Sequence, residues 1–193
     1  MRRAGLALAL ALLFPASAAA QTPSLKVSAK DTFAGGVALT SRSFTARVVM
    51  RPYVEGETVT LRVYRGGKKI RVKALTLKPV DNGAAGVVEL KVKSAKPGRV
   101  LLRASHRATP ALGTLRAKTV GVTVVTPSAG PGARGPAVRL LQAQLAKLKY
   151  VVPRTGVFDA GTANAVMAWR KVMGMARTTL ATKEVFAGLL AGR

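Results

Sequence analysis

The 193-residue chain contains no cysteine and a single histidine. Without thiols it can form no disulfide framework, no thiolate nucleophile and no cysteine-ligated zinc site. One imidazole is also too few for most catalytic zinc sites, which use two or three. We therefore predict no metal site and no cofactor.

Acidic residues are scarce as well, since seven Asp and Glu face 32 Lys and Arg, giving a formal net charge of +25. An excess of this size points to anionic partners. Hydrophobic residues nevertheless make up 49% of the chain, which is enough apolar material to form packed cores. The composition therefore excludes a wholly disordered polybasic tail.

The first 20 residues have the pattern of a secretory signal peptide. Arg2 and Arg3 precede an apolar run over residues 4–14 that is too short to span a bilayer, and small residues follow over 16–20. We predict cleavage before Gln21 and a secreted protein with no transmembrane segment after cleavage. An uncleaved membrane anchor is the alternative.

The rest of the chain divides by composition into two predicted domains. Residues 21–126 are rich in Val, Leu, Thr, Lys and Arg at alternating spacing, whereas residues 135–193 carry Ala, Leu and Gln at helical spacing. Residues 127–134 between them contain Pro, Gly and Ser in proportions typical of a linker. The predicted fold class is multidomain: an all-β sandwich followed by a small all-α three-helix bundle.

Alternation of apolar and polar residues predicts the strands of the first domain. Val59, Leu61 and Val63 place apolar side chains on one face of an extended segment, and a hairpin follows at Gly66. A later change of phase predicts a bulge near Ala74. About seven such strands have the spacing of an antiparallel sandwich, and in pattern and length the domain resembles the immunoglobulin-like or fibronectin-like modules of secreted bacterial proteins.

Much of the charge excess lies in this domain, where 20 Lys and Arg face five Asp and Glu between Lys26 and Lys118. Two interpretations stay open: a solvated outer face that keeps the sheet soluble, or a face that binds anions. The polar-phase positions that carry the charge include Arg62, Arg71, Lys73, Lys91, Lys93 and Arg103.

Nucleic acid is the weaker candidate partner, because few aromatic side chains are present to stack on bases and only Tyr64 lies clearly in the polar phase of a strand. The single histidine, His106, falls at the end of a predicted strand. We expect it to be a surface or turn residue rather than a catalytic base.

The second domain shows three short helical patterns. Pro136 suits the first helical position, and Leu141 and Leu145 belong to an apolar stripe with helical spacing. Asp159 can cap a second helix and Thr182 a third.

Motifs within these helices support a family resemblance. A Leu-Gln pair in the first helix is followed by a Gly-x-Phe-x-x-x-Thr-x-x-Ala-Val-x-x-Trp run that leads into the second. Over residues 135–190 the chain resembles the three-helix bacterial peptidoglycan-binding domain. We expect most matching side chains to serve the core or local hydrogen bonds rather than a ligand. The matching residues are Leu141, Gln142, Leu145, Gly156, Phe158, Thr162, Ala165, Val166 and Trp169.

The resemblance implies a glycopeptide ligand. The exposed candidates to contact it are Tyr150, Arg154 and Asp159, in the loop before the second helix. The chain departs from the family at Lys149 and Asp159, where glycine is common, and at Arg170, where glutamine is common.

Cutting glycan strands usually requires two carboxylates, but the second domain offers only Asp159 and Glu184, both near predicted helix starts where a carboxylate caps. We therefore predict no catalytic residues. The expected protein is a noncatalytic binder of peptidoglycan in the cell wall or periplasm, whose basic sandwich adds attraction to anionic wall polymers.

Two alternatives remain open. A sandwich followed by such a bundle is similar to the N-terminal part of secreted L,D-transpeptidases, whose catalytic domain uses a cysteine, so the chain could be the targeting part of a truncated wall-remodelling enzyme. The other alternative is a generic extracellular polyanion-binding or adhesive protein.

Overall fold

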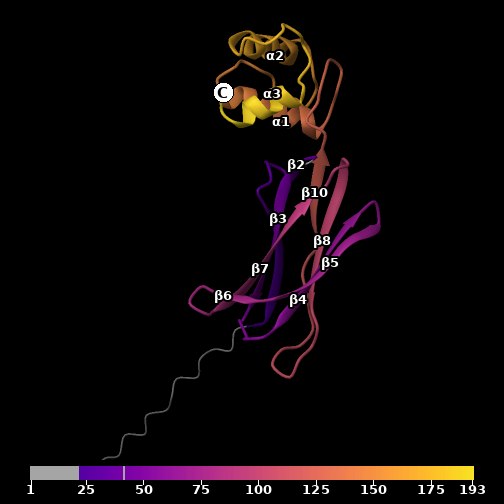
Figure 1. The fold of residues 1–193 in the computed structure, drawn as a ribbon, viewed down its shortest axis with the longest axis vertical. Helices are drawn as coiled ribbons and strands as arrows, with labels where there is room; N and C mark the ends of the chain where they lie inside the picture. Colours follow the sequence, from indigo (N-terminus) through magenta and orange to yellow (C-terminus); the bar gives the residue numbers. More distant parts are fainter. Residues whose placement is uncertain (1–21, 41) are drawn as a thin grey trace, which may run out of the picture.

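The computed structural model describes residues 22–40 and 42–193, and the predicted signal peptide lies outside the described residues. Strands come first along the chain and three helices follow. The strands form an elongated body and the helices lie at one end of it (Figure 1). A mostly β fold followed by a small helical part is therefore confirmed. Among the described residues, no helix has the length and apolarity needed to cross a membrane.

The strands pair into two sheets. One has the order β1-β3-β7-β6, and the other has the order β2-β10-β8-β4-β5 with β9 paired to β8. β2 and β10 pair in parallel, whereas the other pairings described are antiparallel. The bounds are β1 Ser24–Lys30, β2 Val37–Leu39, β3 Ser43–Arg51, β4 Thr58–Arg65, β5 Lys68–Thr76, β6 Lys78–Val80, β7 Ala85–Lys93, β8 Gly98–His106, β9 Leu115–Arg116 and β10 Val120–Val125.

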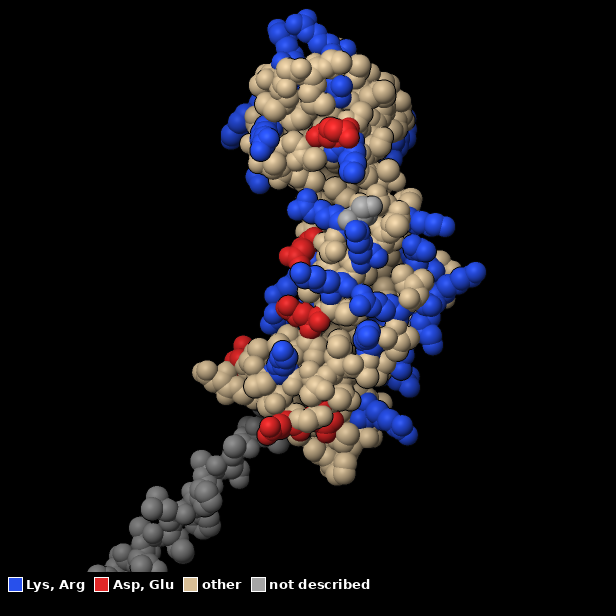
Figure 2. Space-filling model, in the orientation of Figure 1, with Lys and Arg blue, Asp and Glu red and all other residues tan. Residues whose placement is uncertain are grey.

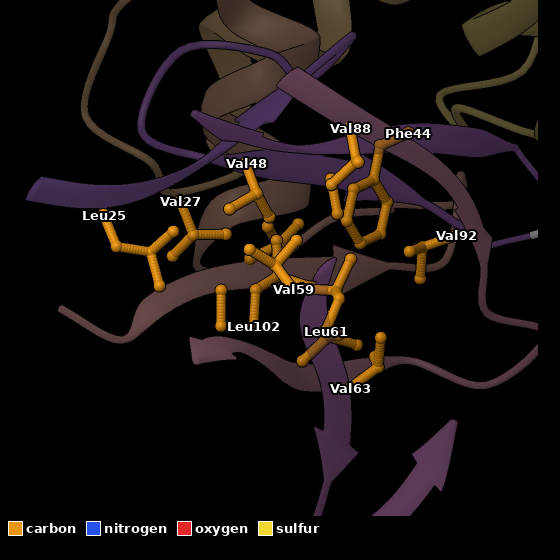
Figure 3. Close-up of a cluster of buried hydrophobic side chains, with 14 of the residues drawn as sticks. Leu25, Val27, Phe44, Val48, Val59, Leu61, Val63, Val88, Val92 and Leu102 are labelled. Carbon is orange, nitrogen blue, oxygen red and sulfur yellow. The ribbon is translucent and has the colours of Figure 1, made fainter. Parts of the chain in front are cut away.

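The two sheets enclose one hydrophobic core. β4 supplies Val59, Leu61 and Val63, which are fully buried and face Phe44 and Val48 of the opposite sheet (Figure 3). Fully burying one such aliphatic side chain stabilises a fold by about 1.5–3 kcal/mol. The alternation seen along the sequence of β4 therefore holds the sheets together.

The long strands match the alternating segments of the sequence, and the short ones do not. β2, β6 and β9 have two or three residues each, which is too short for an alternation to be recognised. The predicted bulge near Ala74 is wrong. Ala74 pairs in register with Thr60, and the register shifts between Val63 and Tyr64 instead.

β5 is an edge strand whose charges differ in phase from the prediction. Lys73 pairs with Leu61 and Arg71 pairs with Val63, so both share the phase of buried residues although they are exposed. Arg71 Nη1 donates a 2.8 Å hydrogen bond to the carbonyl of Lys91 on the other sheet. The prediction that Arg71 and Lys73 occupy the polar phase is therefore wrong, because β5 extends past the covered part of the core.

The three helices begin where the sequence indicates. Pro136 opens the first helix, Asp159 caps the second through its side chain, and Thr182 occupies the N-cap of the third without a side-chain capping bond. The bounds are α1 Pro136–Lys147, α2 Ala160–Val172 and α3 Lys183–Leu190.

Each helix ends with a residue in the left-handed conformation. The residues are Lys149 at φ 69°, Gly174 at φ 66° and Gly192 at φ 75°. After α1, the Lys149 N–H donates to Ala146 O at 3.0 Å and the Tyr150 N–H donates to Leu145 O at 3.1 Å. These two bonds close a Schellman motif, in which glycine is the preferred left-handed residue. Lys149 thus occupies a glycine position.

The sheets and the helices are packed against each other. Val37 and Leu39 of β2 are buried in one hydrophobic cluster with the core residues of the three helices. The segment predicted as a linker joins this contact, because Ala129 and Ala181 exchange two backbone hydrogen bonds of 2.9 Å. The end of the sandwich therefore forms part of the base of the bundle.

His106 is buried, with 1% of its surface exposed, so its predicted surface or turn position is wrong. Its Nε2 lies 2.7 Å from a carboxylate oxygen of Glu57, and its Nδ1 lies 3.1 Å from the carbonyl of Gly113. The second Glu57 oxygen accepts a hydrogen bond from the Thr109 hydroxyl. The bonds from Thr109 and, next, from His106 hold the pKa of Glu57 below its ordinary value of 4.5.

The left-handed lysine gives a first testable expectation. Lys149→Gly should raise the free energy of unfolding by about 1 kcal/mol, because it relieves the Cβ of a left-handed conformation. Urea denaturation measures the change. Ala143→Gly, at an exposed position inside α1, is the matched control and should lower stability by about 1 kcal/mol. Equal effects of the two substitutions would contradict the assigned conformation.

The Glu57 site gives a second expectation. A carboxyl group whose folded pKa is depressed adds stability above its ordinary pKa and loses it as the pH falls through the folded value. Thr109→Val should therefore lower the urea midpoint relative to Thr109→Ser, which keeps the hydroxyl, and this gap should narrow as the pH falls below 4.5. A gap of the same size at neutral and acidic pH would show that Thr109 does not act through the Glu57 carboxylate.

Candidate ligand-binding loop of the helical bundle

A buried amide side chain positions the loop that holds the predicted ligand contacts. Gln142 on α1 is fully buried, and its Nε2 donates to Val157 O and to Thr162 Oγ1, both at 2.9 Å. Its Oε1 accepts a 2.8 Å bond from the Gly156 N–H. One side chain therefore fixes both the loop and the start of α2.

Glycine is required at the centre of this loop. Gly156 is buried at φ 77°, and a Cβ there would lie 2.6 Å from Arg139 Nε. The other residues of the family-like motif are also buried and occupy the core of the bundle or the Gln142 network. They are Leu141, Leu145, Phe158, Thr162, Ala165, Val166 and Trp169.

Asp159, a predicted ligand contact, caps the N-terminus of α2. Its Oδ1 accepts hydrogen bonds from the Thr162 N–H and from the Thr162 hydroxyl, both at 2.8 Å. These two bonds, the backbone one first, hold the pKa of the Asp159 carboxyl below its ordinary value. The carboxylate is therefore ionised at neutral pH, and its second oxygen is left for other partners.

Tyr150 and Arg154, the other predicted contacts, lie on the same loop in different surroundings. Tyr150 is half-buried and packs against the core of the bundle. Arg154 is exposed, and within residues 22–40 and 42–193 no carboxylate forms an ion pair with it. A ligand at this loop would thus meet a partly exposed tyrosine, a guanidinium without an ion pair in the described residues and a fixed carboxylate.

The positions at which the chain departs from the family have structural roles. Lys149 is the left-handed residue after α1. Arg170 is buried, and its guanidinium donates to the carbonyls of Ala176 at 2.6 Å and Leu180 at 3.2 Å. These bonds hold the connection between α2 and α3 on the bundle, so the arginine stabilises this part of the fold.

Sequence reasoning missed two cavities where the sandwich meets the helices. Both combine residues from the β2 region with residues of the bundle more than 80 positions later, so no local pattern could show them. The first has a volume of about 380 Å³ and includes Phe33, Val37, Arg139, Leu140 and Gln144 in its lining. The second, of about 430 Å³, includes Leu39, Arg42, Pro127, Lys183 and Phe186.

Side chains able to hold a metal ion do not gather in the described part of the chain, where no group of three or more His, Asp or Glu forms. The chemistry that this loop offers is hydrogen bonding and charge pairing at a surface.

Comparison with protein families gives a match in the helical segment. Residues 134–189 match the model of the putative peptidoglycan binding domain. The match covers all of α1 and α2 and nearly all of α3, together with the loop held by Gln142. No curated protein compared with the chain matches it.

Solved structures show only distant likeness. A peptidoglycan-binding protein from Clostridioides difficile is 13% identical, with 68% of this chain and 92% of that chain covered and a TM-score of 0.33. The CARDB domain of a Pyrococcus furiosus protein is 13% identical over 54% of this chain and 94% of that one, with a TM-score of 0.35. A β-glucosidase from Listeria innocua is 12% identical over 53% and 16%, also with a TM-score of 0.35. Scores of this size do not identify a function.

The Gln142 network gives a third expectation. Gln142→Met keeps the side-chain volume but leaves the buried Gly156 N–H without its acceptor and removes the bonds to Val157 O and Thr162 Oγ1, which should cost about 1–3 kcal/mol of stability. The same change at Gln144, which forms no side-chain hydrogen bond in the described structure, should cost less than about 0.5 kcal/mol. Urea denaturation of both variants measures the difference, and similar losses would refute the role of Gln142.

Proposed function

We propose that the protein is a secreted, noncatalytic binder of peptidoglycan. The observation that supports this most directly is the family match over residues 134–189, which falls on three helices whose loop is rigidly held by Gln142. In this proposal residues 1–20 are a cleaved signal peptide, and Tyr150, Arg154 and Asp159 contact the glycopeptide. The protein acts in the cell wall or periplasm.

We further propose that residues 21–126 form an immunoglobulin-like sandwich, that residues 127–134 connect it to the bundle, and that the bundle comprises residues 135–193. The sandwich adds electrostatic attraction to anionic wall polymers. Figure 2 is consistent with this role, because Lys and Arg side chains are spread over both sides of the sandwich in that view and acidic side chains are few.

The surroundings of the carboxylates support a role in binding rather than glycan cleavage. A glycosidase needs two carboxylates on either side of one bond, with one of them kept protonated. Here Glu57 is bonded to His106, and Asp159 caps α2. The pKa of each is lowered, which is the opposite of what a general acid needs.

Co-sedimentation with purified sacculi tests the proposal, using the chain from Gln21, which keeps every described element. Binding through apolar and hydrogen-bonding contacts should persist at about 1 M salt, where the Debye length is about 3 Å, whereas binding by charge alone should not. Loss of all sedimentation at high salt would support the generic polyanion binder instead.

The loop is tested by the combined variant Tyr150→Leu, Arg154→Gln and Asp159→Asn. Leucine keeps apolar packing and asparagine keeps the helix cap, so the fold should be retained. We expect at least a tenfold loss of high-salt affinity for sacculi. Lys171→Gln combined with Glu184→Gln is the matched control, since it also leaves the net charge unchanged at exposed bundle positions. Unchanged binding by the loop variant would rule out these three residues as the contacts.

A further inference from the structure

Three arginines lie together on the outer face of the six-stranded sheet, far from the bundle loop in sequence. Arg62 on β4 is directly paired with Arg103 on β8, and Arg116 on β9 is paired with Ser105, two residues along β8 from Arg103. Paired residues project from the same face of a sheet. Arg62, Arg103, Ser105 and Arg116 therefore belong to one surface cluster, here called the arginine cluster.

Neutral groups hold two of these arginines in place. Arg62 Nη1 donates a 2.7 Å hydrogen bond to Ser105 Oγ. The Arg103 guanidinium lies over the ring of Tyr64, 4.8 Å from its centroid. All seven acidic residues of the chain lie in the described part, and none forms an ion pair with a member of the arginine cluster. The charges of Arg62 and Arg103 are therefore held in place but not neutralised.

This arrangement has an energetic cost in the free protein. Like charges placed directly opposite each other on neighbouring strands destabilise a sheet. A face that needs only solubility does not require two arginines fixed opposite each other by a serine and a tyrosine, without an acid to pair with them. An anion bound between the guanidinium groups would remove the repulsion.

The arginine cluster lines an open hollow with space for a ligand. This hollow has a volume of about 450 Å³ and is lined by the three arginines together with Tyr64, Ala104, Ser105, Ala117 and Thr119. Its lining offers guanidinium and hydroxyl donors and no carboxylate. The volume is sufficient for a phosphate group with an attached polyol unit.

We propose that the arginine cluster binds phosphate groups of a polyol-phosphate polymer. One carboxylate is satisfied by a single guanidinium in bidentate contact, whereas three guanidinium groups suit the several anionic oxygens of successive phosphodiesters. Nucleic acid is disfavoured because Arg103 covers the one aromatic ring in the hollow that could stack on a base. A planar membrane is disfavoured because exposed Lys26 and Lys93 lie on the other sheet, and one planar surface would not reach both sheets of the sandwich.

This inference rests on the proposed role of the sandwich in binding anionic wall polymers, and it names their chemical class. It does not require the bundle to bind glycan. Its test is calorimetric titration of the chain from Gln21 with a synthetic glycerol-phosphate oligomer. Arg62→Gln combined with Arg103→Gln should weaken binding at least tenfold. Lys26→Gln combined with Lys93→Gln removes the same charge from exposed positions of the other sheet, and it should weaken binding less than twofold.

A charge-preserving pair separates geometry from charge. Arg62→Lys combined with Arg103→Lys keeps the net charge but loses the bidentate fork, so a loss of at least threefold is expected. Equal affinities of the glutamine pair and its Lys26 and Lys93 control would overturn the site. Thermal unfolding of each variant verifies that the fold is kept. If the Arg62→Lys, Arg103→Lys variant binds as tightly as the unaltered chain, the bidentate contact is overturned.

Further binding measurements identify the source of the phosphate. Tighter binding to phosphatidylglycerol vesicles or to a single-stranded oligonucleotide than to the glycerol-phosphate oligomer would overturn the polymer assignment. At high salt, the Arg62→Gln, Arg103→Gln variant and the unaltered chain should bind equally well to sacculi stripped of phosphate polymers. That last measurement reports on the bundle alone, so a failure of peptidoglycan binding and a failure of the arginine cluster are distinguishable.

Discussion

The shortage of carboxylates constrains the whole molecule. Seven acidic side chains cannot neutralise 32 basic ones, so most guanidinium groups that the fold orders are held by neutral acceptors. Arg65 donates to the hydroxyl of Ser94, Arg71 to the carbonyl of Lys91, and Arg170 to two carbonyls. A neutral acceptor orients a cation without cancelling its charge. The fold therefore keeps its positive potential while fixing many of the groups that create it.

The parts of the fold that follow from the sequence are those in which one strand carries its own pattern of burial. Long strands such as β4 carry the alternation that buries their valines, and this pattern is visible without a structure. The phase of β5 is not visible, because an edge strand that extends past the core no longer needs apolar residues on its inward side. The burial of His106 depends on Glu57, which is 49 residues away. Partnerships across that distance leave no local signal.

Only some features of the candidate site could likewise be predicted from the sequence. The Gln142 and Gly156 positions could be recognised from the motif, since a buried amide and a left-handed glycine are demands of the backbone itself. The substitutions at Lys149 and Arg170 could not be interpreted, because their roles come from a left-handed turn and from carbonyls that only the folded bundle presents. The cavities beside β2 require the docking of sandwich and helices, which no helical or strand period encodes.

The strand that leads into the bundle has a mechanical consequence. β10 is hydrogen-bonded on one side to β8 and on the other to β2, and the chain then passes directly into the segment that pairs with Ala181. A force that pulls the bundle away from the sandwich would run along β10 and load both rows of hydrogen bonds in shear. Bonds loaded in shear must break together rather than one after another. The topology therefore resists the separation of the bundle from the sandwich.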